Sequence, residues 1–163
     1  MTDTTIQKPT VQLTQEGYDE IVAELKELEE VILPRVIQRV ETARQYGDLS
    51  ENAEYSSAKE EQELTDTKIS DLKNILQNAT IVKQSTKVGS VGIGSHLSVK
   101  VLSGGSKKTQ TFTIVGEFEA EPHSGKISSV SPLGKAFMGK KKGDQVEVEV
   151  PAGKMAYEVL EVK

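Results

Sequence analysis

The spacing of apolar residues in the first half of the chain is the feature that most limits its fold. Between residues 18 and 43, apolar side chains recur at intervals of three and four, with glutamates between them. This is the period of an amphipathic α-helix. Thr14 stands ahead of it as the predicted N-cap, and Pro34 predicts a kink or short break, because a proline removes one helical hydrogen bond. The apolar stripe consists of Tyr18, Ile21, Leu25, Leu28, Ile32, Val36, Val40 and Ala43.

A second apolar stripe with the same period follows a turn that begins at Gly47. Its members are Ala58, Thr65, Ile69, Leu72, Leu76 and Ala79. Two helices joined by a few residues bury their stripes against each other as an antiparallel hairpin. We therefore predict a helical hairpin over residues 13–80 with an exposed tip at 47–54.

The composition changes after residue 79, where glycine and serine become more frequent and the apolar runs become short and strand-like. These runs predict strands at residues 97–102, 110–115, 126–130, 145–150 and 155–162. A short helix within a crossover is the interpretation of residues 131–138. We predict a linker over residues 81–92 and a small β-rich domain over 93–163, so that the whole chain is of the α+β class.

Charge and composition exclude several kinds of function. Residues 1–80 carry 8 Lys or Arg and 17 Asp or Glu, and the chain has no Trp. An acidic half without aromatic platforms does not bind nucleic acid by itself, so another macromolecule must hold any nucleic acid involved. The absence of Cys and the presence of two His argue against a thiolate or histidine metal site. No apolar run approaches a membrane span and the first residues do not form a secretory signal, so we expect a cytoplasmic protein.

The predicted tip carries the sharpest local signal of the sequence. Asp48 and Glu51 lie three residues apart where the chain turns. Carboxylate oxygens suit a hard cation such as Mg²⁺, but two of them form only part of a site, so a partner would have to complete it. The alternative is helix capping, with Asp48 as N-cap and Glu51 in the first turn, and the spacing alone favours it.

Two basic residues, Arg44 and Lys59, flank the tip on the two predicted helices. There they could meet a phosphate group. Ordinary ion pairs with Glu41 or Glu60 are the alternative, and the residues alone favour that alternative.

The run GDLSENAEY at residues 47–55, with Ala43 and Arg44 before it and Ala58 to Glu60 after it, resembles the Gre family of bacterial transcript cleavage factors. The C-terminal stretch at 115–153 extends the resemblance over nearly the whole chain. The first ten or so residues fall outside the resemblance, so we expect residues 1–12 to form a loose extension. The resemblance implies an N-terminal coiled-coil hairpin and a C-terminal domain of FKBP-like fold. It also implies a monomer that binds bacterial RNA polymerase.

The resemblance further implies how such a chain acts. The C-terminal domain would dock at the rim of the polymerase secondary channel, and the hairpin would bring Asp48 and Glu51 to the active centre. There they would help to hold a second Mg²⁺ that the chain does not bind stably alone. The chain would not be an enzyme but would stimulate the polymerase's own cleavage of backtracked nascent RNA.

The resemblance assigns roles to seven further residues. Arg44 and Lys59 would contact the RNA 3′ segment, and Asn52 and Tyr55 would support the tip. Ser131, Pro132 and Phe137 would contact the polymerase.

Three alternative functions remain open. A channel inhibitor and a coiled-coil adaptor would both lack cleavage stimulation. A prolyl isomerase or chaperone is disfavoured, because residues 81–163 supply few aromatic side chains for its pocket.

Overall fold

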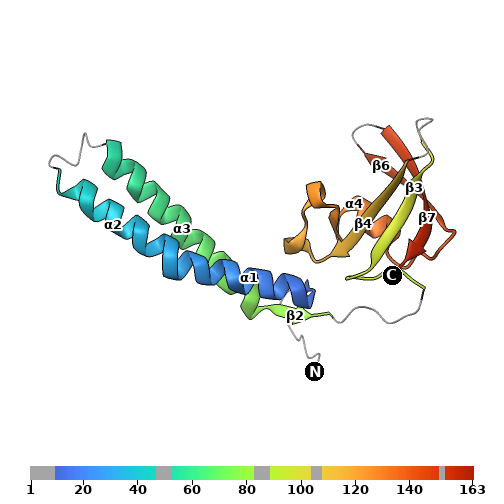
Figure 1. Cartoon of the computed structure of the whole chain (residues 1–163), viewed down its shortest axis with the longest axis horizontal. Coiled ribbons are helices and arrows are strands. Elements are labelled where there is room, and N and C mark those ends of the chain that lie inside the picture. Colours follow the sequence, from blue (N-terminus) through green and yellow to red (C-terminus); the bar gives the residue numbers. More distant parts are fainter. Residues whose placement is uncertain (1–9, 47–52, 83–88, 104–107, 151–152) are drawn as a thin grey trace, which may run out of the picture. The chain divides into compact units, whose positions relative to one another are not determined.

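The computed structural model describes residues 10–46, 53–82, 89–103, 108–150 and 153–163. The chain divides into two compact units, of which one comprises Tyr18–Asn78 and the other Met1–Gly17 with Ala79–Lys163. The first unit is a hairpin of long helices and the second is built around a curled β-sheet (Figure 1). The predicted α+β class is therefore confirmed.

The first arm of the hairpin is a helix with a wider turn in its middle. Helix α1 (Gln15–Glu27) passes into a π-helical turn, η1 (Leu28–Ile32), and then into α2 (Leu33–Arg44). The backbone keeps right-handed helical dihedral angles at both ends of η1. Pro34 stands in the first turn of α2, just after η1. At the place where Pro34 predicted a kink or short break, the helix contains a π-helical turn. A wider turn accommodates the proline ring without breaking the helix.

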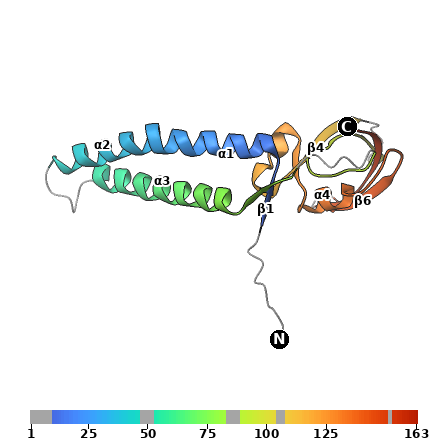
Figure 2. The ribbon, with the colours of Figure 1, turned by 90° about the horizontal axis from the view of Figure 1, so that it is seen from below.

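The second arm is α3 (Ala53–Gln77), which lies alongside α2 in both views (Figure 2). All eight members of the first predicted stripe are buried or half-buried, whereas Val22, Val31 and Ile37 lie off the stripe and are exposed. The second stripe is buried at Ala58, Thr65, Ile69 and Leu72. The helical period read from the sequence therefore identifies the faces by which the arms pack.

The first strand of the chain was not predicted. Strand β1 (Val11–Leu13) pairs in parallel with β2 (Ala79–Ile81), so Val11 and Gln12 are paired within the segment expected to be a loose extension. A parallel pair needs a long connection between its strands, and the whole helical hairpin supplies it. Strands of three residues are too short to show a period, which is why the sequence did not reveal them.

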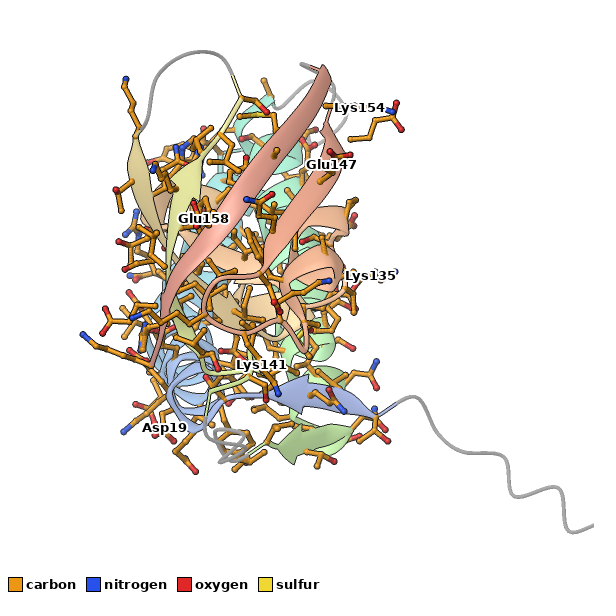
Figure 3. All side chains as sticks on the ribbon, turned by 90° about the vertical axis from the view of Figure 1, so that its right-hand side faces the viewer. Asp19, Lys135, Lys141, Glu147, Lys154 and Glu158 are labelled. Carbon is orange, nitrogen blue, oxygen red and sulfur yellow. The ribbon has the colours of Figure 1, made fainter. Side chains whose placement is uncertain are left out.

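The β-sheet has the order β5-β4-β3-β7-β6. Its strands are β3 (His96–Val101), β4 (Thr109–Val115), β5 (Lys126–Ser128), β6 (Gln145–Val150) and β7 (Gly153–Val162). The β4–β5 pair is parallel and the other pairs are antiparallel. Figure 3 shows β6 beside β7, with the labelled Glu147, Lys154 and Glu158 carried on these strands. Each predicted strand corresponds to an observed one.

Three aromatic rings occupy the core of this domain. Helix α4 (Pro132–Phe137) contributes the fully buried Phe137, whose ring centroid lies 6.2 Å from that of Phe112 and 5.7 Å from that of Tyr157. Val91 belongs to the same core, although its segment was expected to be a linker. The aromatic side chains that an isomerase pocket would need are thus mostly used for packing.

Thr14, which begins the first helix, forms hydrogen bonds both within that helix and with the turn that contains Glu119. The Thr14 hydroxyl oxygen accepts a hydrogen bond from the Gly17 N–H at 3.0 Å, which confirms the predicted N-cap. The Glu119 carboxylate, in the 3₁₀ turn η2 (Glu117–Glu119), accepts bonds from the Thr14 N–H at 2.7 Å and from its hydroxyl at 2.6 Å. A side chain at Gly116 would meet the Gln12 carbonyl oxygen at 2.1 Å, so only glycine allows this approach.

Candidate functional site

The candidate site lies at the end of the hairpin, where α2 ends and α3 begins. The last helical turn of α2 continues through Gln45 and Tyr46, whose N–H groups donate to the carbonyls of Thr42 and Ala43 at 3.1 and 3.3 Å. The predicted tip acids Asp48 and Glu51, and the supporting Asn52, lie outside the described residues. The structure therefore describes the two helix ends that precede and follow the tip in the sequence.

An arginine on α2 joins the two arms close to this end. The Arg39 Nε atom donates a hydrogen bond to Glu54 Oε1 at 2.7 Å, and Arg39 Nη1 donates to Glu61 Oε2. Glu54 lies in the first turn of α3 and Glu61 two turns further along the same helix. One guanidinium group thus bridges two carboxylates of the facing helix, a use of its planar set of donors that a lysine cannot reproduce.

The contact between Arg39 and Glu54 changes the pKa of both groups. The hydrogen bond from Arg39, and then its positive charge, lower the pKa of Glu54 below the ordinary glutamate value. The hydrogen bond and charge of Glu54 in turn raise the pKa of Arg39. Both groups remain charged at neutral pH, so the bridge is an ion pair there.

An open hollow of about 430 Å³ lies beside the bridge on the surface of the hairpin. Arg35, Arg39, Thr42, Tyr46 and Glu54 contribute to its lining. The Tyr46 side chain is 81% exposed, which is a high value for an aromatic ring. The hollow combines positive charge with an aromatic face next to the tip.

The two basic residues predicted to flank the tip lie on the expected helices. Arg44 is the last residue of α2 and is exposed, and Lys59 lies half-buried in the second turn of α3. The Lys59 ammonium donates to Gln62 Oε1 at 3.1 Å. Within the described residues, neither Arg44–Glu41 nor Lys59–Glu60 forms an ion pair, and neither basic residue lines the hollow. Tyr55 lies half-buried in the first turn of α3.

The three residues predicted to bind a partner through the second domain differ in exposure. Pro132 is exposed at the start of α4. The Ser131 hydroxyl caps α4, accepting from the Gly134 N–H at 3.0 Å and donating to the Ser128 carbonyl at 2.7 Å. Phe137 is 0% exposed and packs in the core of the domain. An apolar residue in a short helix is equally compatible with a surface and with a core, so the sequence did not distinguish the two, and the contact of these three residues with a partner stays a prediction.

Two further features bear on the chemistry of the described part of the chain. It contains no group of three carboxylate or imidazole side chains placed to hold a metal ion. None of the helices in these ranges is both long enough and apolar enough to cross a membrane.

Comparison with known proteins assigns both parts of the chain. Residues 11–81 match the model of the N-terminal domain of transcription elongation factors, and residues 85–163 match the C-terminal domain of GreA/GreB transcription elongation factors. The chain belongs to the GreA/GreB family. The two matches together span nearly the whole sequence, and so confirm the resemblance carried by the GDLSENAEY run.

Two relatives named transcription elongation factor GreA support the same assignment. The chain is 39% identical over 155 residues to a transcription elongation factor GreA of Bacillus cereus, covering 94% of this chain and 97% of the relative. It is 42% identical over 154 residues to a GreA of Helicobacter hepaticus, covering 94% and 93%. Among solved structures, GreA factor homolog 1 of Thermus thermophilus is 27% identical, with a TM-score of 0.44 and coverage of 94% and 99%.

In this family member, the residues that the sequence did not single out are Arg39, Glu54 and Glu61. Glu54 stands inside the GDLSENAEY run but carries no distinguishing pattern of its own. The sequence shows that Arg39 and the two glutamates carry opposite charges. Whether they meet depends on how the two helices are aligned lengthwise. That alignment is a tertiary property, so only the structure brings these three residues together.

Proposed function

We propose that this transcription elongation factor stimulates the cleavage of backtracked nascent RNA by bacterial RNA polymerase. The tip of the hairpin would enter the secondary channel and add carboxylates to the active centre of the polymerase. Water would then hydrolyse an internal phosphodiester of the displaced RNA, leaving a new 3′ end in register for extension. The hydrolysis belongs to the polymerase, and this chain supplies part of the site.

One observation carries the proposal: in this family member, the sequence that connects two packed helical arms contains Asp48 and Glu51. The second arm alone has 25 residues, which corresponds to about 38 Å of helix. Two packed helices bury less surface than a globule of the same length, so this shape suits a function that requires reach. Two long packed arms would be suited to delivering the oxygen ligands of the connecting segment into a channel.

The tip acids have a defined chemical role in this proposal. Asp48 and Glu51 would supply oxygen ligands to a Mg²⁺ ion that is otherwise held by the polymerase and the RNA phosphate. Such an ion lowers the pKa of bound water and neutralises charge that develops on the phosphate. Carboxylates suit this hard cation, and the described part of the chain contains no complete metal site that would compete for it.

The residues around the tip would hold the RNA and shape the loop. Arg44, exposed at the end of α2, and Lys59, on α3, would contact phosphates of the displaced RNA 3′ segment. Asn52 and Tyr55 would maintain the geometry of the tip. In the second domain, the exposed Pro132 and the segment capped by Ser131 would contact the rim of the channel. Phe137 would hold α4 in place from the core.

The test uses a purified backtracked elongation complex with Mg²⁺, to which the wild-type protein or Asp48→Asn with Glu51→Gln is added. We expect the wild type to accelerate release of short 3′ RNA fragments, and the double variant to bind polymerase without accelerating release. A control variant, Glu147→Gln on the exposed face of β6, should behave as the wild type.

The other outcomes separate the remaining functions. If both proteins bind polymerase and neither stimulates cleavage, the chain is an inhibitor or an adaptor. If neither binds polymerase, the proposed partner is wrong.

A further inference from the structure

The position of the Arg39 bridge suggests a role beyond holding two helices together. Arg39 stands five residues before the end of α2, and Glu54 is the second residue of α3. Residues 47–52 connect these two helix ends in the sequence. A contact that fixes both ends of a short connection also limits the conformations that the connection can adopt.

The bridge is also the ion pair of the described hairpin that lies closest to the tip. Two other cross-helix pairs join Lys68 to Glu24 and Lys73 to Glu29, each with an N···O distance of 2.6 Å. Along α3, Lys68 lies 14 residues beyond Glu54, or about 21 Å. The lysine pairs also join the two arms by opposite charges but lie farther along the hairpin, so they provide controls for a general effect of cross-helix ion pairs.

The fully buried side chains near this end of the hairpin are small. The buried side chains closest to the tip on the two arms are Ala43 and Ala58, the smallest that a helix can bury apart from glycine. An alanine makes few van der Waals contacts compared with a leucine or isoleucine. The charge-assisted hydrogen bonds of Arg39 add contacts of fixed geometry between the two helix ends.

We propose that Arg39, Glu54 and Glu61 form a positioning clamp that holds the two helix ends in the arrangement that presents the tip carboxylates productively. This inference rests on the proposed cleavage function for its catalytic consequence. None of the three residues needs to touch RNA, metal or polymerase. Their contribution is to restrict the geometry of the tip, and a small misplacement of a catalytic group is costly.

The clamp has a physical readout that does not depend on cleavage. The chain has no Cys, so Gln45→Cys and Ser56→Cys introduce unique labelling sites on exposed positions at the two helix ends. We expect a narrow distribution of spin-label distances in the otherwise wild-type protein, and a clearly broader one when Arg39→Met is added. Lys68→Gln should leave the distribution narrow. An equally narrow distribution with Arg39→Met would overturn the clamp.

The functional test measures RNA cleavage over a range of factor concentrations. Arg39→Met removes the donor, and Glu54→Ala with Glu61→Ala removes both acceptors. We expect each protein to lower the maximal cleavage rate about tenfold while leaving the half-maximal concentration unchanged. Combining all three changes should lower the rate no further, because residues of one network are not additive. Arg39→Lys should restore part of the rate, and Lys68→Gln should stay within about twofold of wild type.

Two results would contradict the clamp in different ways. If Arg39→Met lowers the rate but removal of both glutamates does not, Arg39 acts through its own charge on the RNA. If Lys68→Gln lowers the rate as strongly, the effect is general stability of the hairpin. Failure of the proposed function is distinguishable, because the wild type itself would then be inactive while the distance measurement still tests the clamp.

Discussion

The hairpin and the β domain bury their apolar residues in different ways. Each arm of the hairpin has a single apolar stripe, which leaves side chains such as Val31 and Leu64 more than half exposed. The β domain surrounds Phe137 and Leu97 completely, so both are 0% exposed. A contact between two helices removes less apolar surface from water than a closed core does, and hydrophobic stabilisation follows the area removed.

The ion pairs of the two regions differ as well. Ion pairs join α3 to the first arm of the hairpin at Glu24, Glu29 and Arg39. In the β domain, Lys163 pairs with Glu161, two residues away at the end of the chain. The comparison teaches that charged pairs along the sides of the two helices supplement a narrow apolar stripe, whereas the β domain has a closed apolar core.

The largest effect is expected from the core of the β domain. Phe137→Ala should reduce the free energy of unfolding by about 3–5 kcal/mol, because it removes a fully buried ring that contacts two others. Urea-dependent hydrogen exchange of amides in β3 and in α3 would measure the two units separately. The control Pro132→Ala, at an exposed position in the same helix, should cost much less. Equal losses in β3 and α3 would show that the two units unfold together.

A smaller effect is expected from a cross-helix ion pair. Lys68→Gln should reduce the stability of the hairpin by about 0.2–1 kcal/mol, since both partners are roughly half exposed. The difference from wild type should shrink as salt is raised towards about 1 M, where screening acts over a few ångströms. Thermal unfolding followed by helical circular dichroism is the measurement. Lys154→Gln on β7 serves as the control, and a salt-independent loss would mean that the lysine acts by packing.

The smallest effect is expected from protonation of Glu54. Its pKa in the folded state is lowered by the Arg39 hydrogen bond, so its stabilising contribution is complete above the ordinary glutamate value. That contribution is lost as the pH falls through the lowered pKa. An NMR titration of the Glu54 carboxyl carbon should give a higher pKa in Arg39→Met than in wild type, and an unchanged pKa in Lys68→Gln. Identical titration curves in all three proteins would show that the bridge is not formed in solution.

The sequence by itself determined the local structure of this protein. The period of three and four identified both helical arms and their buried faces, from Tyr18 to Ala43 and from Ala58 to Leu72. Alternating runs and glycine turns located the five strands of the sheet, and the GDLSENAEY run indicated the family that the domain models confirm. These features are encoded in short segments, because each depends on neighbours a few residues apart.

Only the tertiary structure decided which distant residues meet. Arg39 could have faced several glutamates of α3, and the lengthwise alignment of the helices selects Glu54 and Glu61. Tertiary packing likewise decides that the Thr14 N–H donates to the Glu119 carboxylate, that β1 pairs with β2, and that Phe137 is buried. A local pattern sets the period of an element and the face that it buries. The partner on that face is set by the packing of the whole chain, which no short segment contains.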